Sequence, residues 1–239
     1  MAATSAHPNP PPRLLSQPLS QPLSQRGMRG VAVVSAASVG LVVVRSIIVG
    51  HPSFLFLCWN LFLAVLPLLF ARVAVRSVAS GKGRWWVMLW SLLWLLFFPN
   101  APYIITDFVH LGSRNAISLW FDAVMIGGFA WAGLILGFQS LALMQWLISK
   151  KYGGRIGWSL VVGVIVAASY GTYLGRFQRW NSWDLAVQPV ALLADIFSSI
   201  AHPATIAQGL ALTVGMAVFL LLAYGCWVVM ARDRGAGGK

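Results

Sequence analysis

Long apolar stretches separated by short polar connections dominate the chain after about residue 30. Six of them can be delimited, at residues 31–49, 53–71, 85–105, 117–146, 156–175 and 205–230. A helix needs about 20 residues to cross the hydrocarbon core of a bilayer, and each stretch reaches or approaches that length. The pattern predicts an all-α fold, a polytopic membrane helix bundle with about six transmembrane helices.

The third stretch is the least regular of the six. Pro99 and Pro102 interrupt its backbone hydrogen bonding soon after Phe98. Each proline leaves a carbonyl that must find a partner in the protein or in a wet cavity. The side-chain amide of Asn100 is a candidate partner. The sequence leaves open whether the break only kinks the helix or borders a cavity.

The segments outside the apolar stretches are predicted from their composition. Residues 1–28 are rich in Pro, Ser and Gln, which predicts a disordered cytoplasmic tail. Residues 29–231 then form the six-helix transmembrane domain, and residues 232–239 form a short basic cytoplasmic tail. In the fifth connection, apolar residues at helical spacing from Pro189 to Ile200 predict a short interfacial amphipathic helix.

Charge and composition exclude a soluble, nucleic-acid-binding protein. Hydrophobic residues make up 59% of the chain and charged ones only 9%, against about 25% charged residues in a soluble domain. The net charge of +12 comes mostly from basic residues in short connections beside apolar stretches. The predicted partner is the lipid bilayer, and no nucleic acid is expected.

The basic residues also predict the topology. They fill the second and fourth connections, at 72–84 and 150–155, and they flank the first and last stretches. Cytoplasmic loops of membrane proteins carry this excess of Lys and Arg. Both termini are therefore expected in the cytoplasm, with the protein in a plasma (inner) membrane.

Two stretches carry small residues at intervals of four. They are Gly133 and Gly137 in the fourth stretch, and Gly163, Ala167, Gly171 and Gly175 in the fifth. Small residues at this spacing let helix backbones approach closely in lipid. We expect these faces to pack on neighbouring helices.

With this topology, polar residues converge on the side of the membrane away from the cytoplasm. If residues 103–114 are helical, then Tyr103, Asp107, His110 and Arg114 fall along one side. Asp107 and His110 could bind a divalent metal or relay a proton, and Asp122 is a third metal candidate. The alternative is that the stripe is the wet face of an interfacial helix.

A second polar group follows the fifth stretch. Arg176 and Arg179 are one turn apart, and Trp183 stands between Asn181 and Asp184 in the run RWNSWD. Two guanidinium groups beside indole rings suit an anionic headgroup or a phosphate. Alternatively, the arginines reach lipid phosphates and the indoles belong to the aromatic belt of the membrane.

Two polar residues lie inside apolar stretches, where they are costly and tend to face the bundle. Asn60 lies well inside the second stretch, and Arg45 lies near the outer end of the first. Arg45 can pair with Asp107 or with Asp122.

Four runs of the sequence resemble a known family: NLFLAVLPLLFA (60–71), WLLFFPNAPYIITDFVHL (94–111), WFDAVMIGGFAWAGLILGFQSL (120–141) and YLGRFQRWNSWD (173–184). Together they resemble the bacterial membrane proteins grouped as domain of unknown function 1361, over roughly residues 50–225. The resemblance implies a polytopic bacterial membrane protein and carries no established activity. It gives weight to the polar residues inside the runs, which are Asn60, Asn100, Tyr103, Asp107, His110, Asp122, Arg176, Arg179, Asn181, Trp183 and Asp184.

These observations support four hypotheses of function. The first is a membrane protein that binds an anionic ligand or lipid headgroup at an outward-facing polar pocket. The second is a membrane-embedded hydrolase that uses Asp107, His110 and Asp122 for metal-assisted or acid–base hydrolysis, although no hydrolase signature is present. The others are a small-solute transporter and an accessory subunit without a ligand. The sequence specifies no cofactor and no oligomeric state.

Overall fold

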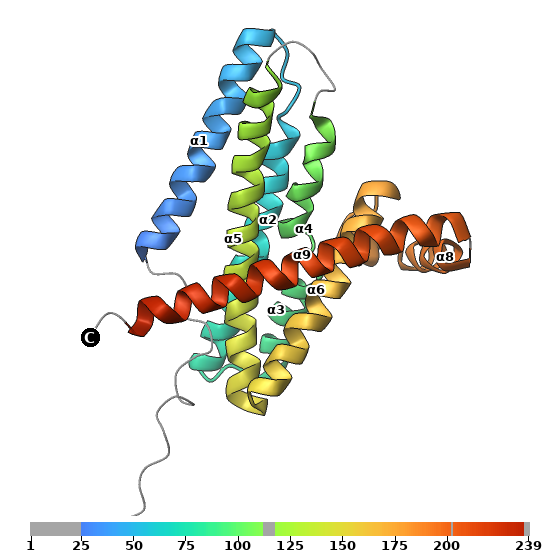
Figure 1. Cartoon of the computed structure of the whole chain (residues 1–239). Helices are drawn as coiled ribbons and strands as arrows, with labels where there is room; N and C mark the ends of the chain where they lie inside the picture. Colours follow the sequence, from blue (N-terminus) through green and yellow to red (C-terminus); the bar gives the residue numbers. More distant parts are fainter. Residues whose placement is uncertain (1–24, 112–117, 202, 237–239) are drawn as a thin grey trace, which may run out of the picture.

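The computed structural model describes residues 25–111, 118–201 and 203–236, and throughout these ranges the regular structure is helical (Figure 1). The helices are, in order, α1 (Gln25–Val49), α2 (Phe56–Ala79), α3 (Arg84–Phe97), α4 (Asn100–Tyr103), the 3-10 helix η2 (Ile104–His110), α5 (Leu119–Tyr152), α6 (Gly154–Phe177), α7 (Asp184–Val187), α8 (Pro189–Ala201) and α9 (Pro203–Ala236). The predicted all-α fold is confirmed.

Six helical segments are long and apolar enough to cross a membrane, as predicted: Gly27–Val49, Phe56–Ala79, Arg84–His110, Leu119–Tyr152, Gly154–Phe177 and Gly209–Ala231. Several helices run beyond the apolar stretches. The second and fourth spans continue past Arg76 and Lys150, because long basic side chains can place their charge in water while the helix continues. The first and last helices likewise extend to Gln25 and Ala236, into residues that the sequence assigns to the tails.

Many large apolar side chains point outward from the bundle. Ile47, Trp120 and Leu222 are 75%, 76% and 66% exposed, and they lie on three different helices. A soluble monomer rarely exposes apolar surface on this scale. The surrounding solvent that fits this surface is a lipid bilayer.

Helix α5 is the centre of the bundle. It packs against α1, α2 and α6, while α3 packs on α2 and α9 packs on α6. Figure 1 shows α9 lying across the other helices rather than alongside them. The short helix α8 begins at Pro189, as predicted, and packs its Leu192 side chain against Tyr173 and Leu174 of α6.

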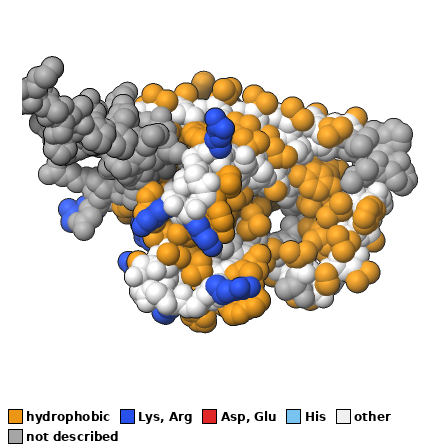
Figure 2. All heavy atoms as spheres, turned by 90° about the horizontal axis from the view of Figure 1, so that it is seen from below, with side chains coloured by type: hydrophobic (Ala, Val, Ile, Leu, Met, Phe, Trp, Pro, Cys, Tyr) orange, Lys and Arg blue, Asp and Glu red, His pale blue; other side chains and the backbone are white. Residues whose placement is uncertain are grey.

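One end of the bundle carries the basic connections. The α2–α3 turn, with Lys82 and Arg84, and the α5–α6 turn, with Lys151 and Arg155, both lie at the lower end in Figure 1. Figure 2 looks at this end and shows Lys and Arg side chains gathered among apolar ones. Asp107 lies near the end of the third span and Asp122 in the first turn of α5, so both lie at the opposite end of the bundle from these turns.

The third span is broken where the two prolines predict a break. Helix α3 ends at Phe97, and the Asn100 side-chain Nδ2 donates to the Phe97 carbonyl oxygen at 2.9 Å, as expected from the sequence. The predicted polar stripe assumed a helix over residues 103–114, and residues 104–110 are helical but form a 3-10 helix. Three residues per turn place Asp107 and His110 on the same side. Arg114, the last residue of the predicted stripe, lies outside the described residues.

The residues at the break, from Pro99 to Ile104, pack closely against glycines of α5 and α6. A Cβ atom at Gly133 would lie 2.9 Å from the Ala101 carbonyl oxygen, and one at Gly171 would lie 3.2 Å from the Pro99 ring. Gly137 and Gly175 make similarly close approaches, to Ala101 and Tyr103 respectively. The predicted close packing is therefore confirmed at these four glycines. It is wrong at Gly163, which has no such neighbour within 4 Å.

The contrast between Gly133 and Gly163 gives a direct test of this packing. Gly133→Ala should destabilise the protein by about 1–3 kcal/mol, because the added methyl group overpacks the contact with α4. Gly163→Ala should leave stability unchanged or raise it by up to about 1 kcal/mol through helix propensity. Unfolding of both variants in detergent measures this, and equal effects would contradict the packing.

Candidate functional site

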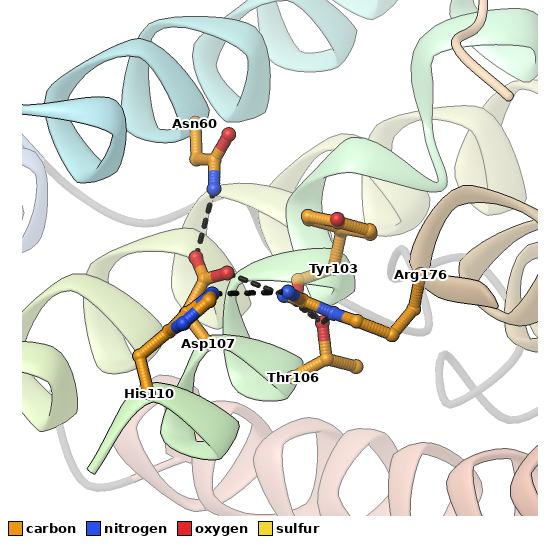
Figure 3. Close-up of polar contacts among 6 residues, drawn as sticks. All are labelled: Asn60, Tyr103, Thr106, Asp107, His110 and Arg176. Carbon is orange, nitrogen blue, oxygen red and sulfur yellow. Dashed lines mark hydrogen bonds and ion pairs between the residues drawn. The ribbon is translucent and has the colours of Figure 1, made fainter. Parts of the chain in front are cut away.

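Asp107 is the centre of a polar cluster formed by η2, α2 and α6 (Figure 3). It is only 1% exposed. The Asn60 Nδ2 atom donates to its Oδ2 at 2.8 Å, and the Arg176 Nη2 atom donates to its Oδ1 at 2.5 Å. Both carboxylate oxygens therefore have a donor, which compensates for the loss of water.

Arg176 uses almost all of its hydrogen-bonding capacity inside this cluster. Its Nε and Nη2 atoms donate to Thr106 Oγ1 at 2.9 and 2.6 Å, and its Nη1 atom lies 3.3 Å from His110 Nε2. Its guanidinium carbon lies 4.7 Å from the centre of the Tyr103 ring. Because arginine can only donate, this contact is a hydrogen bond when the His110 tautomer presents Nε2 as the acceptor.

A second buried ion pair joins α1 to α5. Arg45 donates to both carboxylate oxygens of Asp122, from Nε at 2.6 Å and from Nη2 at 3.0 Å. It also donates to Ser53 Oγ at 2.7 Å and stacks on the Phe54 ring. The sequence left Asp107 and Asp122 open as partners of Arg45, and in the structure Arg45 pairs with Asp122.

The structure does not bring the three metal candidates together. Asp107 and Asp122 each bind a different arginine, and His110 contacts Arg176. In the described part of the chain, no three His, Cys, Asp or Glu side chains gather as metal ligands would. Each of the three candidates instead contacts an arginine, Arg176 or Arg45.

The residues of the run RWNSWD lie apart from the Asp107 cluster. Arg179 is exposed, takes a left-handed conformation with φ of 61°, and shares none of the Arg176 contacts. The Asn181 backbone N–H and Nδ2 both donate to Asp184 Oδ2, at 2.6 and 3.2 Å, which closes a turn. Trp183 is 38% exposed. Arg176 and Arg179 thus do not form the paired anion site that their spacing suggests.

A groove of about 650 Å³ lies beside the cluster, between α3 and α6. These two helices pack on α2 and α5 respectively, and the space between them remains open. The groove has an apolar floor from α3 and α6 and a polar end. Its polar end is lined by Asn60, Asn100, Tyr103, Asn181 and Ser182.

The polar end links the groove to the buried cluster. Asn60 and Tyr103 line the groove and also contact Asp107 and Arg176. The Asn100 Nδ2 atom donates to Ser182 Oγ at 2.9 Å, which holds the α6–α7 connection over the break. Ser182 and Thr106 were not predicted as site residues, although both lie inside the runs 173–184 and 94–111. The leucines of α3 were not predicted either, because an apolar wall carries no polar signal in the sequence.

A comparison with protein families identifies the chain. The sequence model of the family described as protein of unknown function (DUF1361) matches residues 59–223. The chain belongs to this family. No curated protein and no solved structure matches it significantly. The DUF1361 match includes the whole groove and the Asp107 cluster, but it begins after Arg45.

The Arg45–Asp122 pair should stabilise the fold without taking part in ligand binding. Asp122→Leu alone should cost about 3–5 kcal/mol, because it leaves the Arg45 charge buried and unpaired. The double variant Arg45→Met/Asp122→Leu should recover most of that loss. Unfolding of both variants in detergent measures the coupling, and an Asp122→Leu protein as stable as wild type would contradict it.

Proposed function

We propose that this membrane protein binds an amphiphilic, lipid-like molecule in the groove between α3 and α6. The polar group of the ligand would lie against Asn100, Tyr103 and Ser182, and its apolar chain would lie along α3. The observation that carries the proposal is the groove itself, which is apolar along its length and polar at one end.

The apolar wall supports a ligand that comes from the bilayer. Leu89, Leu92 and Leu95 line the groove and are 43%, 56% and 43% exposed, so the groove opens on the lipid-facing surface of α3. Its volume of about 650 Å³ lies within the range of about 300–1,000 Å³ that is usual for small-molecule sites. A chain could therefore enter sideways from the membrane.

The buried ion pair supports the polar end of this site rather than forming it. Asp107 holds Asn60, and Arg176 lies under the Tyr103 ring. Asp107 and Arg176 neutralise each other in an ion pair, which leaves little net charge to attract a ligand. We therefore assign Asp107, His110 and Arg176 as positioning residues, with Asn100, Tyr103 and Asn181 as ligand contacts.

A bulky residue in the groove should abolish binding. Ala167→Trp would fill the space beside α3, whereas Val166→Trp, on the neighbouring outward position of α6, would not, since Val166 does not line the groove. Native mass spectrometry of protein extracted with its lipids should show a retained amphiphile in wild type and Val166→Trp, and its loss in Ala167→Trp. Equal retention in all three proteins would refute the proposal.

We also propose that the basic end of the bundle faces the cytoplasm of a bacterium, with the protein in the plasma membrane. The gathering of Lys and Arg at the α2–α3 and α5–α6 turns supports this orientation. The polar end of the groove would then lie toward the outer side of the membrane.

Labelling of single cysteines tests the orientation. In a chain with Cys58 and Cys226 replaced by Ala, a membrane-impermeant maleimide should label a His51→Cys variant in intact cells. It should label a Lys82→Cys variant only after lysis. Both positions are exposed, at opposite ends of α2. The reverse pattern would contradict the proposed orientation.

A further inference from the structure

The three asparagines at the polar end of the groove share one feature. Each donates its side-chain N–H groups to an acceptor within the protein: Asn60 to Asp107, Asn100 to Phe97 and Ser182, and Asn181 to Asp184. In each case the side-chain oxygen, Oδ1, accepts no hydrogen bond from the described residues.

The direction of these amides is fixed by their partners. The Asp107 and Asp184 carboxylates and the Phe97 carbonyl group can only accept hydrogen bonds, so the amide nitrogen must face each of them. Exchanging the oxygen and nitrogen of any of the three amides would place two acceptors in contact. The polar end of the groove therefore offers unused acceptors from three amides.

Unused acceptors select against a phosphate. A phosphodiester has only acceptor oxygens, and it would meet the Oδ1 atoms without a hydrogen between them. No described residue that lines the groove carries a charge, and the nearby Arg176 already has Asp107 as its counter-ion. An anionic headgroup would thus lose its water without gaining a matching charge.

Hydroxyl groups match what the groove offers. They can donate to the asparagine oxygens and accept from Ser182 Oγ and from the Tyr103 hydroxyl, which has no partner in the described structure. The rings of Tyr103, Trp59 and Trp180 also line this region, and such rings present apolar faces with a polar edge. Amides, hydroxyls and aromatic faces together fit a sugar ring or a polyol.

We propose that the ligand is an uncharged amphiphile with a hydroxyl-rich headgroup, that is, a glycolipid or a polyol lipid. This inference rests on the proposed function, because it specifies the headgroup of the molecule whose chain occupies the groove. It replaces the anionic ligand that the spacing of Arg176 and Arg179 suggests.

A competition experiment tests the headgroup. Wild-type protein is placed in nanodiscs that contain equal amounts of monoglucosyl diacylglycerol, phosphatidylglycerol and phosphatidylethanolamine with the same acyl chains. Native mass spectrometry then measures which lipid stays bound. We expect the glucolipid to be enriched over both phospholipids, and an excess of a soluble methyl glucoside should not displace it.

Removal of one hydroxyl provides the matched variant. Tyr103→Phe keeps the ring over Arg176 and removes only the hydroxyl, so it should lower the enrichment of the glucolipid about threefold to tenfold. Tyr170→Phe removes a buried hydroxyl that also has no partner but lies outside the groove. It should leave the enrichment unchanged.

The outcomes separate the two proposals. Preferential retention of phosphatidylglycerol or of phosphatidylethanolamine would overturn the hydroxyl headgroup but leave the groove as a lipid site. If methyl glucoside displaces the glucolipid, the site binds a sugar without needing an acyl chain. That result would overturn the proposal that the ligand is an amphiphile. Retention of no lipid above its bulk fraction, or identical retention in Ala167→Trp, would refute the lipid-binding function itself.

Discussion

A charge inside a bilayer needs a partner, and the bond between Arg176 and Asp107 meets this need for two helices at once. An ionised group removed from water is costly unless it is paired and hydrogen-bonded. Asp107 lies within the third span and is 1% exposed, so the pairing holds the end of α6 against η2. The geometry of the polar end of the groove follows from this contact.

The groove follows from the same contact together with the proline break. Helix α3 stops at Phe97, and the chain then turns through α4 and η2 to reach α5 and α6. Only this second part of the span is drawn against α6 by the ion pair. The first part, α3, stays on α2, so a space opens between α3 and α6.

Much of the fold could be predicted from the sequence because it depends on local properties. The length of each apolar stretch determines the spans, and the prolines determine where the third one breaks. The bond from Asn100 to the Phe97 carbonyl group could be expected because the two residues are close in the chain. The close approach at Gly133 and Gly171 follows from the spacing of small residues.

The site depends on contacts between distant residues, and these could not be predicted. Arg176 and Asp107 are 69 residues apart, and the sequence offered several acidic partners. Residues 104–110 form a 3-10 helix, yet Tyr103, Asp107 and His110 of the predicted stripe all contact Arg176, a partner that the spacing within the stripe does not specify. Spacing alone also placed Arg179 beside Arg176, whereas its left-handed backbone follows the end of α6.

The most direct measurement is an electron cryo-microscopy map of the protein extracted in nanodiscs with its native lipids. We expect an elongated density between α3 and α6, with its broad end in contact with Asn100, Tyr103 and Ser182. A map in which the α3 leucines close directly onto α6, with no density between them, would contradict the central claim that this groove holds a ligand.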